Sequence, residues 1–412
     1  MTEQAKVPAI RFAGFTDPWE QRKLGEIADK VTEKNLDGNI TEVLTNSAEY
    51  GVINQTEFFD HAVAKESNIA GYYVIAPGDF VYNPRISATA PVGPIRRNTL
   101  GIHGVMSPLY TVFRLTDAVD GTYLSHFFKT NGWHGFMKLE GNSGARSDRF
   151  SIGDATFFEM PIPVPSSSEQ HAIGSFFSRL DDLITLHQRK YDKLVILKKS
   201  MLEKMFPKDG ESVPEIRFAG FTDPWEQRKL EDIANRVTRK NEGESDLPLT
   251  ISSQYGLVDQ RTFFNNQVAS KDMSGYYLLR KGEFAYNKST SGDSPWGAVK
   301  RLVRYEKGCV STLYICFGLD GADPDFLVTY YETDRWYKAV QMIAAEGARN
   351  HGLLNIAPND FFDTALILPP SREEQELIGL FFARLDNLIT LHQRKLELLQ
   401  NIKKSLLDKM FV

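Results

Sequence analysis

Two stretches of the chain carry apolar residues at the spacing of a long helix that packs along one seam. The seam positions recur alternately every four and three residues, at Leu180, Ile184, His187, Tyr191, Leu194, Lys198, Met201 and Met205. The same spacing returns at Leu385, Ile389, His392, Leu396, Leu399, Lys403, Leu406 and Met410. This 3.5-residue period is typical of a coiled coil. It predicts two helices of about 37 residues, each roughly 55 Å long.

Polar residues occupy matching seam positions in the two predicted helices. His187 matches His392, and Lys198 matches Lys403. Such residues can set the register of a coiled coil at some cost in stability, or they can form a pH-dependent or partner-binding element. Both interpretations stay open. A metal site is not expected, because each helix offers one histidine without a second ligand at helical spacing.

The regions before the helices have the pattern of mixed α/β modules. Short runs of β-branched and aromatic residues, such as GYYVIAPGDFVYN, SPLYTVFRL, STLYICFGL and FDTALILPP, are interrupted by Gly and Pro and predict strands and turns. The segments YLSHFFKTNGWHGFMKLE and FLVTYYETDRWYKAVQMIA have helical periodicity instead. The expected fold class is therefore mixed α+β.

The chain contains one unit twice. IRFAGFTDPWEQRKL runs from Ile10 to Leu24 and returns unchanged from Ile216 to Leu230, and RLDDLITLHQRK at 179–190 returns at 384–395 with one difference, Asp182 against Asn387. The sequence between these boundaries keeps its register but has diverged. We expect two similar modules related by a pseudo-twofold axis, with the two helices antiparallel and one module at each end. The predicted domains are residues 1–165, 166–213 (helix and linker), 214–369, and 370–412 (second helix).

Composition narrows the class of protein. The 412 residues are 42% hydrophobic and 25% charged, which is ordinary for a globular protein. A cytoplasmic location is expected, because the sequence has neither a signal-peptide pattern nor an apolar run of about eighteen residues. The two cysteines, Cys309 and Cys316, lie in the second half and form no disulfide framework. A net charge of −5 is unusual for a nucleic-acid binder, although a local basic face can suffice.

Motifs of catalysis are missing from the sequence. It contains no GxxxxGK[ST], GxGxxG, HExxH or GxSxG. Asn83-Pro84 is followed by Arg85 and not by the second proline and aromatic residue of an amino-methyltransferase site. The acid retained in both modules, Asp79 or Glu283, lies in a Gly-containing turn context. The chain is expected to bind and not to catalyse.

The diverged centres contain basic and hydroxyl residues suited to DNA, since Arg and Lys contact phosphates and base edges, and Ser, Thr and Asn form hydrogen bonds to both. Arg96-Arg97 and Lys300-Arg301 fall in matching places, as do Gly144-Ala145-Arg146 and Gly347-Ala348-Arg349. The alternative for each residue is a solvated hairpin tip. The candidate DNA-binding residues are Arg85, Ser87, Arg96, Arg97, Arg146, Arg149, Lys288, Ser289, Thr290, Lys300, Arg301, Arg349 and Asn350.

The whole chain resembles the specificity subunit of bacterial type I restriction-modification systems. The resemblance rests on two diverged modules, on helix openings IPVPSSSEQHAI and ILPPSREEQELI, and on helix ends KKSMLEKMF and KKSLLDKMF. It implies two target recognition domains, each reading one half of a split asymmetric DNA site. It also implies helices that dock two methyltransferase subunits, through which two endonuclease/translocase subunits join and direct adenine methylation or restriction. S-adenosylmethionine, ATP and magnesium would belong to those partners, with no cofactor in this chain.

Two other hypotheses are compatible with the sequence. The chain could be a coiled-coil scaffold that does not contact DNA, because the helices are its most regular feature. It could also be a self-sufficient DNA-modifying enzyme with an unfamiliar site, because some nucleases use scattered carboxylates that no motif reveals.

Overall fold

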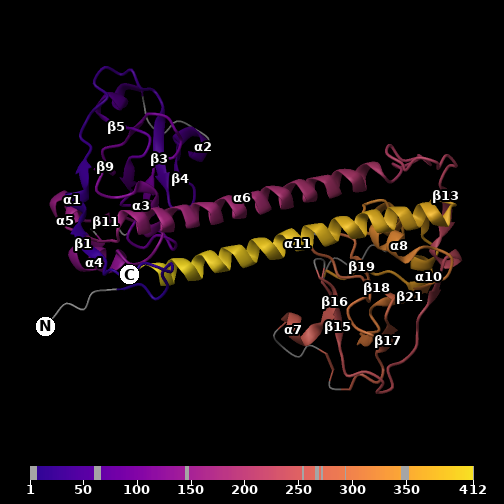
Figure 1. Cartoon of the computed structure of the whole chain (residues 1–412). Helices are drawn as coiled ribbons and strands as arrows, with labels where there is room; N and C mark the ends of the chain where they lie inside the picture. The colour runs from indigo at the N-terminus through magenta and orange to yellow at the C-terminus, as the bar shows by residue number, and fades with distance from the viewer. Residues whose placement is uncertain are drawn as a thin grey trace. The chain divides into compact units, whose positions relative to one another are not determined.

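The computed structural model describes residues 7–59, 66–143, 148–252, 255–264, 269–270, 272–292, 294–344 and 352–411. Contacts divide the chain into two compact units, one made of Met1–Gln188 with Arg394–Val412 and the other of Arg189–Gln393. The two long helices are α6 (Ser167–Lys204) and α11 (Arg372–Met410). Each helix is divided between the two units. Figure 1 shows an α/β module beside helix segments in each unit. The mixed α/β class expected from the sequence is confirmed.

The strands of the first unit form two small sheets and two strand pairs. Their bounds are β1 Glu20–Lys23, β2 Ala28–Lys30, β3 Val43–Ser47, β4 Gly51–Asn54, β5 Tyr73–Ile75, β6 Phe80–Tyr82, β7 Ile95–Arg97, β8 Gly104–Met106, β9 Thr111–Leu115, β10 Asn142–Ser143, β11 Phe150–Ser151 and β12 Pro161–Val164. The sheets have the orders β2-β9-β6-β7 and β4-β3-β8-β5, and the pairs are β1-β12 and β10-β11. β3 and β8 are parallel, whereas the other pairings of these strands are antiparallel.

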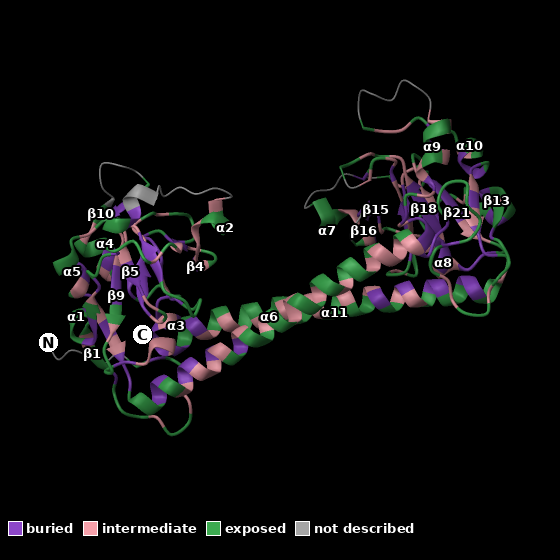
Figure 2. Ribbon diagram, turned by 90° about the horizontal axis from the view of Figure 1, so that it is seen from above, coloured by how far each residue is buried: buried purple, intermediate pink, exposed green. Residues whose placement is uncertain are grey.

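Short helices complete the first module. They are α1 Leu24–Ile27, α2 Gln55–Phe59, the 3-10 helix η1 Glu66–Gly71, α3 Gly121–Phe127, α4 His134–Glu140 and α5 Asp154–Phe158. The core lies between the sheet β2-β9-β6-β7 and the helices, where the rings of Phe80 and Phe113 stack 5.4 Å apart. Burial of such side chains supplies most of the stabilisation of a module of this size. Figure 2 shows the buried strands in purple and the exposed outer helical surfaces in green.

The second unit repeats this arrangement. Its elements are β13 Glu226–Lys229, η2 Leu230–Asp232, β14 Ala234–Arg236, β15 Leu249–Ser252, β16 Gly256–Asp259, α7 Gln260–Phe264, β17 Tyr277–Arg280, β18 Phe284–Asn287, β19 Ala298–Arg301, β20 Lys307–Val310, β21 Ile315–Leu319, α8 Pro324–Tyr330, α9 Tyr337–Ile343, α10 Pro358–Phe362 and β22 Ala365–Leu368. The sheet β14-β21-β18-β19 corresponds to β2-β9-β6-β7. The pairs β15-β16 and β17-β20 are separate, and a single parallel bridge, Pro248–Cys309, stands where the first unit pairs β3 with β8.

The sequence pattern predicted one helical segment in each module. The structure has two shorter helices in place of each predicted segment. YLSHFFKTNGWHGFMKLE forms α3 and α4, with a break that contains Asn131 and Gly132. Both residue types favour turns over helix interiors. In the second unit α8 and α9 are separated in the same way, and the hydroxyl of Thr333 donates to the carbonyl of Tyr330 at 2.6 Å.

The two identical segments hold the ends of the long helices within each unit. Arg11 donates two hydrogen bonds to the carboxylate of Glu169 in the first turn of α6, at 2.8 and 2.7 Å, and the Trp19 indole donates to the same carboxylate at 3.2 Å. The Ile10 amide donates to the carbonyl of Lys409 near the end of α11 at 3.0 Å. One short segment therefore joins the start of one helix to the end of the other.

The second copy makes the same contacts. Arg217 and Trp225 donate to the carboxylate of Glu374 in α11, at 2.7 to 3.4 Å, and the Ile216 amide donates to the carbonyl of Lys204 at 2.9 Å. Glu374 is fully buried, as is Glu169. A buried carboxylate requires such pairing, because an unpaired buried charge costs several kcal/mol.

Within each unit the paired helix segments run in opposite directions. In the first unit Asp181 contacts Lys403, and Phe177, one turn earlier in α6, lies 5.8 Å from the ring of Phe411 beyond the end of α11. In the second unit the helix segments are also antiparallel, since Lys198 bonds Asp386 at 2.5 Å and the rings of Phe206 and Phe382 lie 6.2 Å apart.

No helix in the described part of the chain is long and apolar enough to cross a membrane.

Candidate nucleic-acid interface

The first module has a surface hollow of about 550 Å³ beside the diverged loop that follows β6. Polar side chains from several elements converge on it, because β3, α2 and two loops end at the same edge of the module. The residues that line it include Thr45, Asn46, Ser47, Gln55, Phe58, Asn83, Arg85, Ser87, Thr89, Ser107 and Arg149. Three of the sequence candidates, Arg85, Ser87 and Arg149, therefore meet at one site.

A turn built on Asn83 presents Arg85 at this hollow. The Arg85 amide donates to Oδ1 of Asn83 at 2.9 Å, while Nδ2 of Asn83 donates to the carbonyl of Asn46 at 2.7 Å. The backbones of Arg85 and Arg149 form an antiparallel bridge, which sets two guanidinium-bearing residues opposite each other. The Arg85 side chain is 61% exposed and lies 3.7 Å from Asp148. Because an exposed ion pair of this length is weak, the guanidinium stays available to an anionic partner.

The second module builds the same turn with different side chains. The Ser289 amide donates to Oδ1 of Asn287 at 3.0 Å, and Ser289 forms the equivalent bridge with Leu353. Thr290 donates from its amide and its hydroxyl to the carbonyl of Gly352, at 2.6 and 3.1 Å. The backbone is thus conserved between the modules, but two arginines are replaced by a serine and a leucine.

Lys288 is the middle residue of this turn, between Asn287 and Ser289. Its ammonium group donates to the carbonyl of Ile356 at 3.4 Å, and burial lowers the pKa of Lys288. A partly desolvated lysine is a stronger electrostatic partner for a phosphate than one in water, because solvent screens the charge less.

Three arginine candidates are held by contacts inside their modules. Arg96 donates to the carbonyls of Ile95 and Ala48 at 3.0 and 2.9 Å, and burial lowers the pKa of Arg96. Arg97 donates to the carbonyl of Gly78 at 3.3 Å and Arg301 to the carboxylate of Asp325 at 2.5 Å. These contacts orient the three side chains toward the protein.

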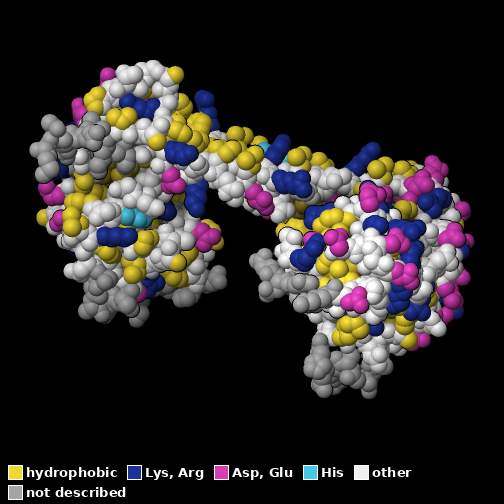
Figure 3. All heavy atoms as spheres, turned by 90° about the horizontal axis from the view of Figure 1, so that it is seen from below, with side chains coloured by type: hydrophobic (Ala, Val, Ile, Leu, Met, Phe, Trp, Pro, Cys, Tyr) yellow, Lys and Arg dark blue, Asp and Glu magenta, His cyan; other side chains and the backbone are white. Residues whose placement is uncertain are grey.

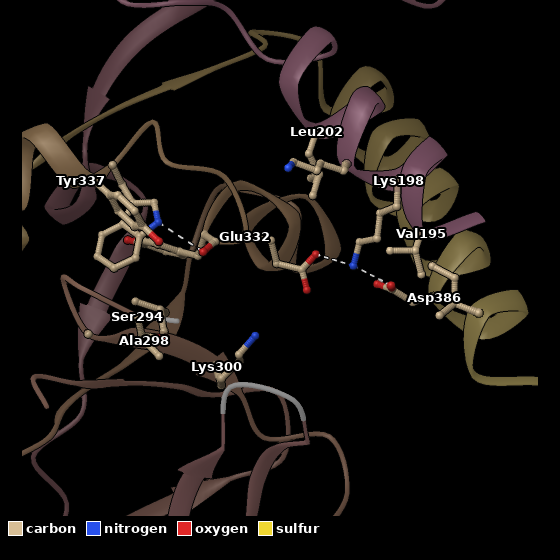
Figure 4. Close-up of a pocket in the computed structure, with 15 residues that line it drawn as sticks. Val195, Lys198, Leu202, Ser294, Ala298, Lys300, Glu332, Tyr337 and Asp386 are labelled. Carbon is tan, nitrogen blue, oxygen red and sulfur yellow. Dashed lines mark hydrogen bonds and ion pairs between the residues drawn. The ribbon is translucent and has the colours of Figure 1, made fainter. Parts of the chain in front are cut away.

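Lys300 occupies the position that matches Arg96 but lines an open hollow of about 460 Å³ in the second unit. Figure 4 shows its ammonium group pointing into this space, near the ion pairs that Lys198 forms with Glu332 and Asp386. The matching residues of the first unit, among them Lys129, Ile184 and Lys403, line a hollow of about 420 Å³, and Arg96 is not part of its lining.

The remaining candidates, Arg146, Arg349 and Asn350, lie outside the described residues.

Among the described residues, the hollow of the first module also contains a group that the sequence analysis missed. Asn46 in β3 is buried, and its Nδ2 donates to the carbonyls of Val81 and Pro94 at 2.7 and 3.2 Å, while its Oδ1 has no partner among the described residues. The residue of the second module that matches Asn46 is Ile251 in β15. Comparison of the two modules could have identified Asn46, because it is a polar residue where the matching strand has an apolar one.

The charges on the modules are mixed. On the face in Figure 3, Lys and Arg are interspersed with Asp and Glu, and no single basic patch covers it. Within the described ranges, no group of three or more His, Cys, Asp or Glu side chains is placed to hold a metal ion. The retained acids are engaged in salt bridges, since Asp79 pairs with Arg114 and Glu283 with Arg239, each at 2.8 Å.

Comparison with known proteins extends these observations. Residues 16–195 match the type I restriction modification DNA specificity domain family. The fold is similar to that of the type I restriction-modification system S subunit from M. genitalium, with a TM-score of 0.60 and 12% identity over 99% of both chains. The HsdS subunit from Thermoanaerobacter tengcongensis matches with a TM-score of 0.44 and 14% identity over 95% of this chain and 96% of that chain.

The family match covers the first module, and the second module repeats its elements and its helix contacts. The likeness to the M. genitalium subunit shows the same fold over the length of the chain. The family expected from the sequence is confirmed for residues 16–195, which match the type I restriction modification DNA specificity domain.

Proposed function

We propose that each of the two modules reads one half of a bipartite, asymmetric DNA target. The observation that carries this proposal is the turn at Asn83 and Asn287, where one backbone presents Arg85 in the first module and Ser289 in the second. Arginine at a base edge favours guanine, whereas a serine hydroxyl accepts or donates and discriminates differently. Two unlike turns on one scaffold would therefore select two unlike half-sites.

The candidate residues divide into two groups under this proposal. Direct contacts to DNA would come from side chains at the hollows and turns, namely Arg85, Ser87, Arg149, Lys288, Ser289, Thr290 and Lys300. Arg96, Arg97 and Arg301 would support the loops, because their guanidinium groups already bond within the module. Arg146, Arg349 and Asn350 remain candidates from the sequence.

A segment exchange tests this function. Residues 46–139 would be replaced by the equivalent segment of a related specificity subunit, and the methylated sites of the host would be mapped. The expected result is a change in one half of the target and an unchanged second half. An unaltered methylation pattern would contradict the assignment of the first module as a reader.

The two long helices would dock two methyltransferase subunits. Leucines at matching positions are exposed on both helices, with Leu183 and Leu186 on α6 and Leu388 and Leu391 on α11, each 43 to 46% exposed. Figure 3 shows apolar side chains along the helix surface. Exposed leucines at helical spacing favour an interaction surface. Two equivalent surfaces predict two modification subunits for each chain.

Charge substitutions on the helices test the docking. Leu183→Asp should remove one modification subunit from the complex and Leu388→Asp the other, as measured by native mass spectrometry. Ile196→Asp is the matched control, because Ile196 is 68% exposed but its counterpart on α11 is the polar Asn401. Loss of both subunits from either single variant would refute two independent docking surfaces.

The remaining parts of the proposed complex follow from the family. Two endonuclease/translocase subunits would join through the modification subunits, and S-adenosylmethionine, ATP and magnesium would be bound by these partners, with this chain acting as a non-catalytic subunit in the cytoplasm. The pairing of α6 with α11 would continue as an antiparallel coiled coil that spaces the two half-sites, with the modules related by a pseudo-twofold axis. The domains would then be the modules 1–165 and 214–369 and the helical parts 166–213 and 370–412.

The alternative of a coiled-coil scaffold without DNA contact makes the opposite prediction for salt. If the hollows bind phosphates, the affinity of the assembled complex for DNA must fall steeply with salt concentration. Binding that ignored both salt and sequence would favour the scaffold. Methyl transfer or cleavage by this purified chain alone would instead favour a self-sufficient enzyme.

A further inference from the structure

Both modules carry the same cluster of three aromatic residues, with at least two of the rings exposed, and we infer that these clusters insert against the DNA base stack independently of its sequence. This inference rests on the proposed function of the modules as DNA readers. The clusters are Tyr50, Phe58 and Phe59 in the first module and Tyr255, Phe263 and Phe264 in the second. Each would act as an apolar wedge that opens a base step and deforms the half-site.

The described residues of the two turns that present the tyrosines share a hydrogen bond and a glycine. The Tyr50 amide donates to Oγ of Ser47 at 3.2 Å, and the Tyr255 amide donates to Oγ of Ser252 at 3.2 Å. A glycine in the left-handed region follows each tyrosine, with φ of 75° at Gly51 and 72° at Gly256. Glycine adopts this conformation without steric cost, so the hairpin turns tightly and leaves the tyrosine at its tip. The tyrosines are 64% and 57% exposed.

The phenylalanines lie on the short helix that follows each hairpin. Asn54 accepts from the Thr56 amide at 2.8 Å at the start of α2, and Asp259 accepts from the Arg261 amide at 2.9 Å at the start of α7. The rings of Phe58 and Phe59 lie 4.7 Å apart, and those of Phe263 and Phe264 lie 5.0 Å apart, both edge to face. The start of the helix and the edge-to-face pair of phenylalanines are therefore the same in both modules.

Exposed aromatic clusters of this kind point to a partner. Phe58 is 40% exposed, while Phe263 and Phe264 are each 46% exposed. Figure 2 shows α7 in green at the surface of the second module. Leaving exposed rings in water forfeits the stabilisation that their burial would give, so a fold that keeps such rings at the same place twice uses them for contact.

The position of the cluster favours DNA as that partner. Phe58 and Phe59 line the same hollow as Arg85, Ser87 and Arg149, whose counterparts in the second module differ. A surface for a shared protein subunit would be expected to keep all of its residues, whereas this one combines constant aromatics with diverged polar groups. Aromatic and other apolar side chains can unstack any base step, because every base has the same kind of face. The constant part would deform the DNA, and the diverged part would read it.

Fluorescence of 2-aminopurine in the assembled complex tests the inference. The base analogue would be placed at successive positions of each half-site, outside the methylated adenine, and bound by the complex of this chain with its modification subunits. The wild-type complex should give increased fluorescence at one step in each half-site. Phe58→Ala/Phe59→Ala should abolish the signal in the first half-site only, and Phe263→Ala/Phe264→Ala the signal in the second only.

Affinity measurements complete the test. Each pair of substitutions should weaken binding to target and unrelated DNA alike, by about tenfold or more, because aromatic stacking contributes on the order of 1–3 kcal/mol per base. The ratio of the two affinities should stay unchanged. Leu139→Ala and Met342→Ala are matched controls at equivalent positions of α4 and α9, both 80% exposed, and should change neither readout.

The possible failures are distinguishable. A wild-type complex that bound its target no better than unrelated DNA would refute the proposed function itself. A wild-type complex that discriminated normally, with variants that bound and unstacked DNA like the wild type, would overturn the inference alone. Variants that fold, as judged by thermal unfolding, but no longer assemble with the modification subunits would show that the aromatics contact protein.

Discussion

The two units hold their helices with charge clusters that match in position but differ in sign, which makes substitution of one aspartate informative. In the first unit Asp181 of α6 contacts Lys403 of α11 and accepts from Lys129 of the module at 3.0 Å. The matching cluster has one lysine between two acids, since Lys198 lies 2.5 Å from Asp386 and 2.7 Å from Glu332. We predict that Asp181→Asn destabilises its unit much more than Asp386→Asn destabilises the other.

The difference follows from what each substitution leaves behind. Without the charge of Asp181, two half-buried ammonium groups face each other unpaired, whereas Lys198 without Asp386 keeps the carboxylate of Glu332. The pKa directions agree: the pKa of Asp181 is lowered despite its burial, because Lys129 and Lys403 stabilise the carboxylate, while burial raises the pKa of Asp386. Hydrogen bonds to charged groups contribute about 1.5–3 kcal/mol each, less when partly solvated. We expect a cost of about 2–3 kcal/mol for Asp181→Asn and below about 1 kcal/mol for Asp386→Asn.

Hydrogen exchange with mass spectrometry measures both costs in one chain, because it reports the free energy of opening for α3 and α8 separately. The matched rescue is Lys129→Glu in the Asp181→Asn background. It gives the first cluster the same charges as the second cluster with Asp386→Asn, because a carboxylate at position 129 would face Lys403 as Glu332 faces Lys198. Most of the lost stability should therefore return. Equal costs for the two aspartate substitutions, or no rescue, would refute the electrostatic reasoning.

Three further predictions concern the helices and their contacts. Burial lowers the pKa of His126 to about 4, below the value of about 6.5 in the unfolded chain. The free energy of unfolding of the first unit should therefore fall by roughly 3 kcal/mol as the pH drops from 6.5 toward 4, because the unfolded state binds the proton more readily. His126→Thr, which copies Thr329, should remove this pH dependence in urea unfolding. Gly379→Ala should cost more than Gly174→Ala in thermal unfolding, within about 1–3 kcal/mol, because the added Cβ would lie 2.6 Å from the backbone nitrogen of α8 against 3.1 Å from that of α3. Deleting one heptad from both long helices should shorten the tolerated gap between half-sites by about three base pairs in a methylation assay, and an unchanged gap would contradict the spacer role.

Regular features of the chain were predictable from its sequence. The 3.5-residue spacing predicted long helices where α6 and α11 lie, because the period depends only on which side chains share a face. GYYVIAPGDFVYN forms strands β5 and β6 around a turn at Gly78, where φ is 94°. Turn chemistry and alternation are local, so one sequence sufficed for these elements.

Contacts between distant segments were not predictable in the same way. Arg96 and Arg85 are both arginines in a diverged region, yet the first is held by carbonyls from three separate segments and the second is exposed. Which of the two is available to a partner depends on where those carbonyls meet in space. Asn46 is similar, since its buried amide is recognisable only once β3 lies beside β6 and the loop before β7.

The perfect repeat IRFAGFTDPWEQRKL acquires a physical explanation from its contacts. Arg11 and Trp19 hold Glu169 of α6, and the backbone of Ile10 bonds α11. The helix ends that the two segments contact are themselves repeated in the sequence. A change in one copy of the segment would therefore have to fit helix residues that are the same at both sites. Side chains at the hollows have no such constraint, because Arg85 bonds to Asn83 and Asp148 of its own module. The chain can therefore change what its modules recognise while the segments that hold the helices stay fixed.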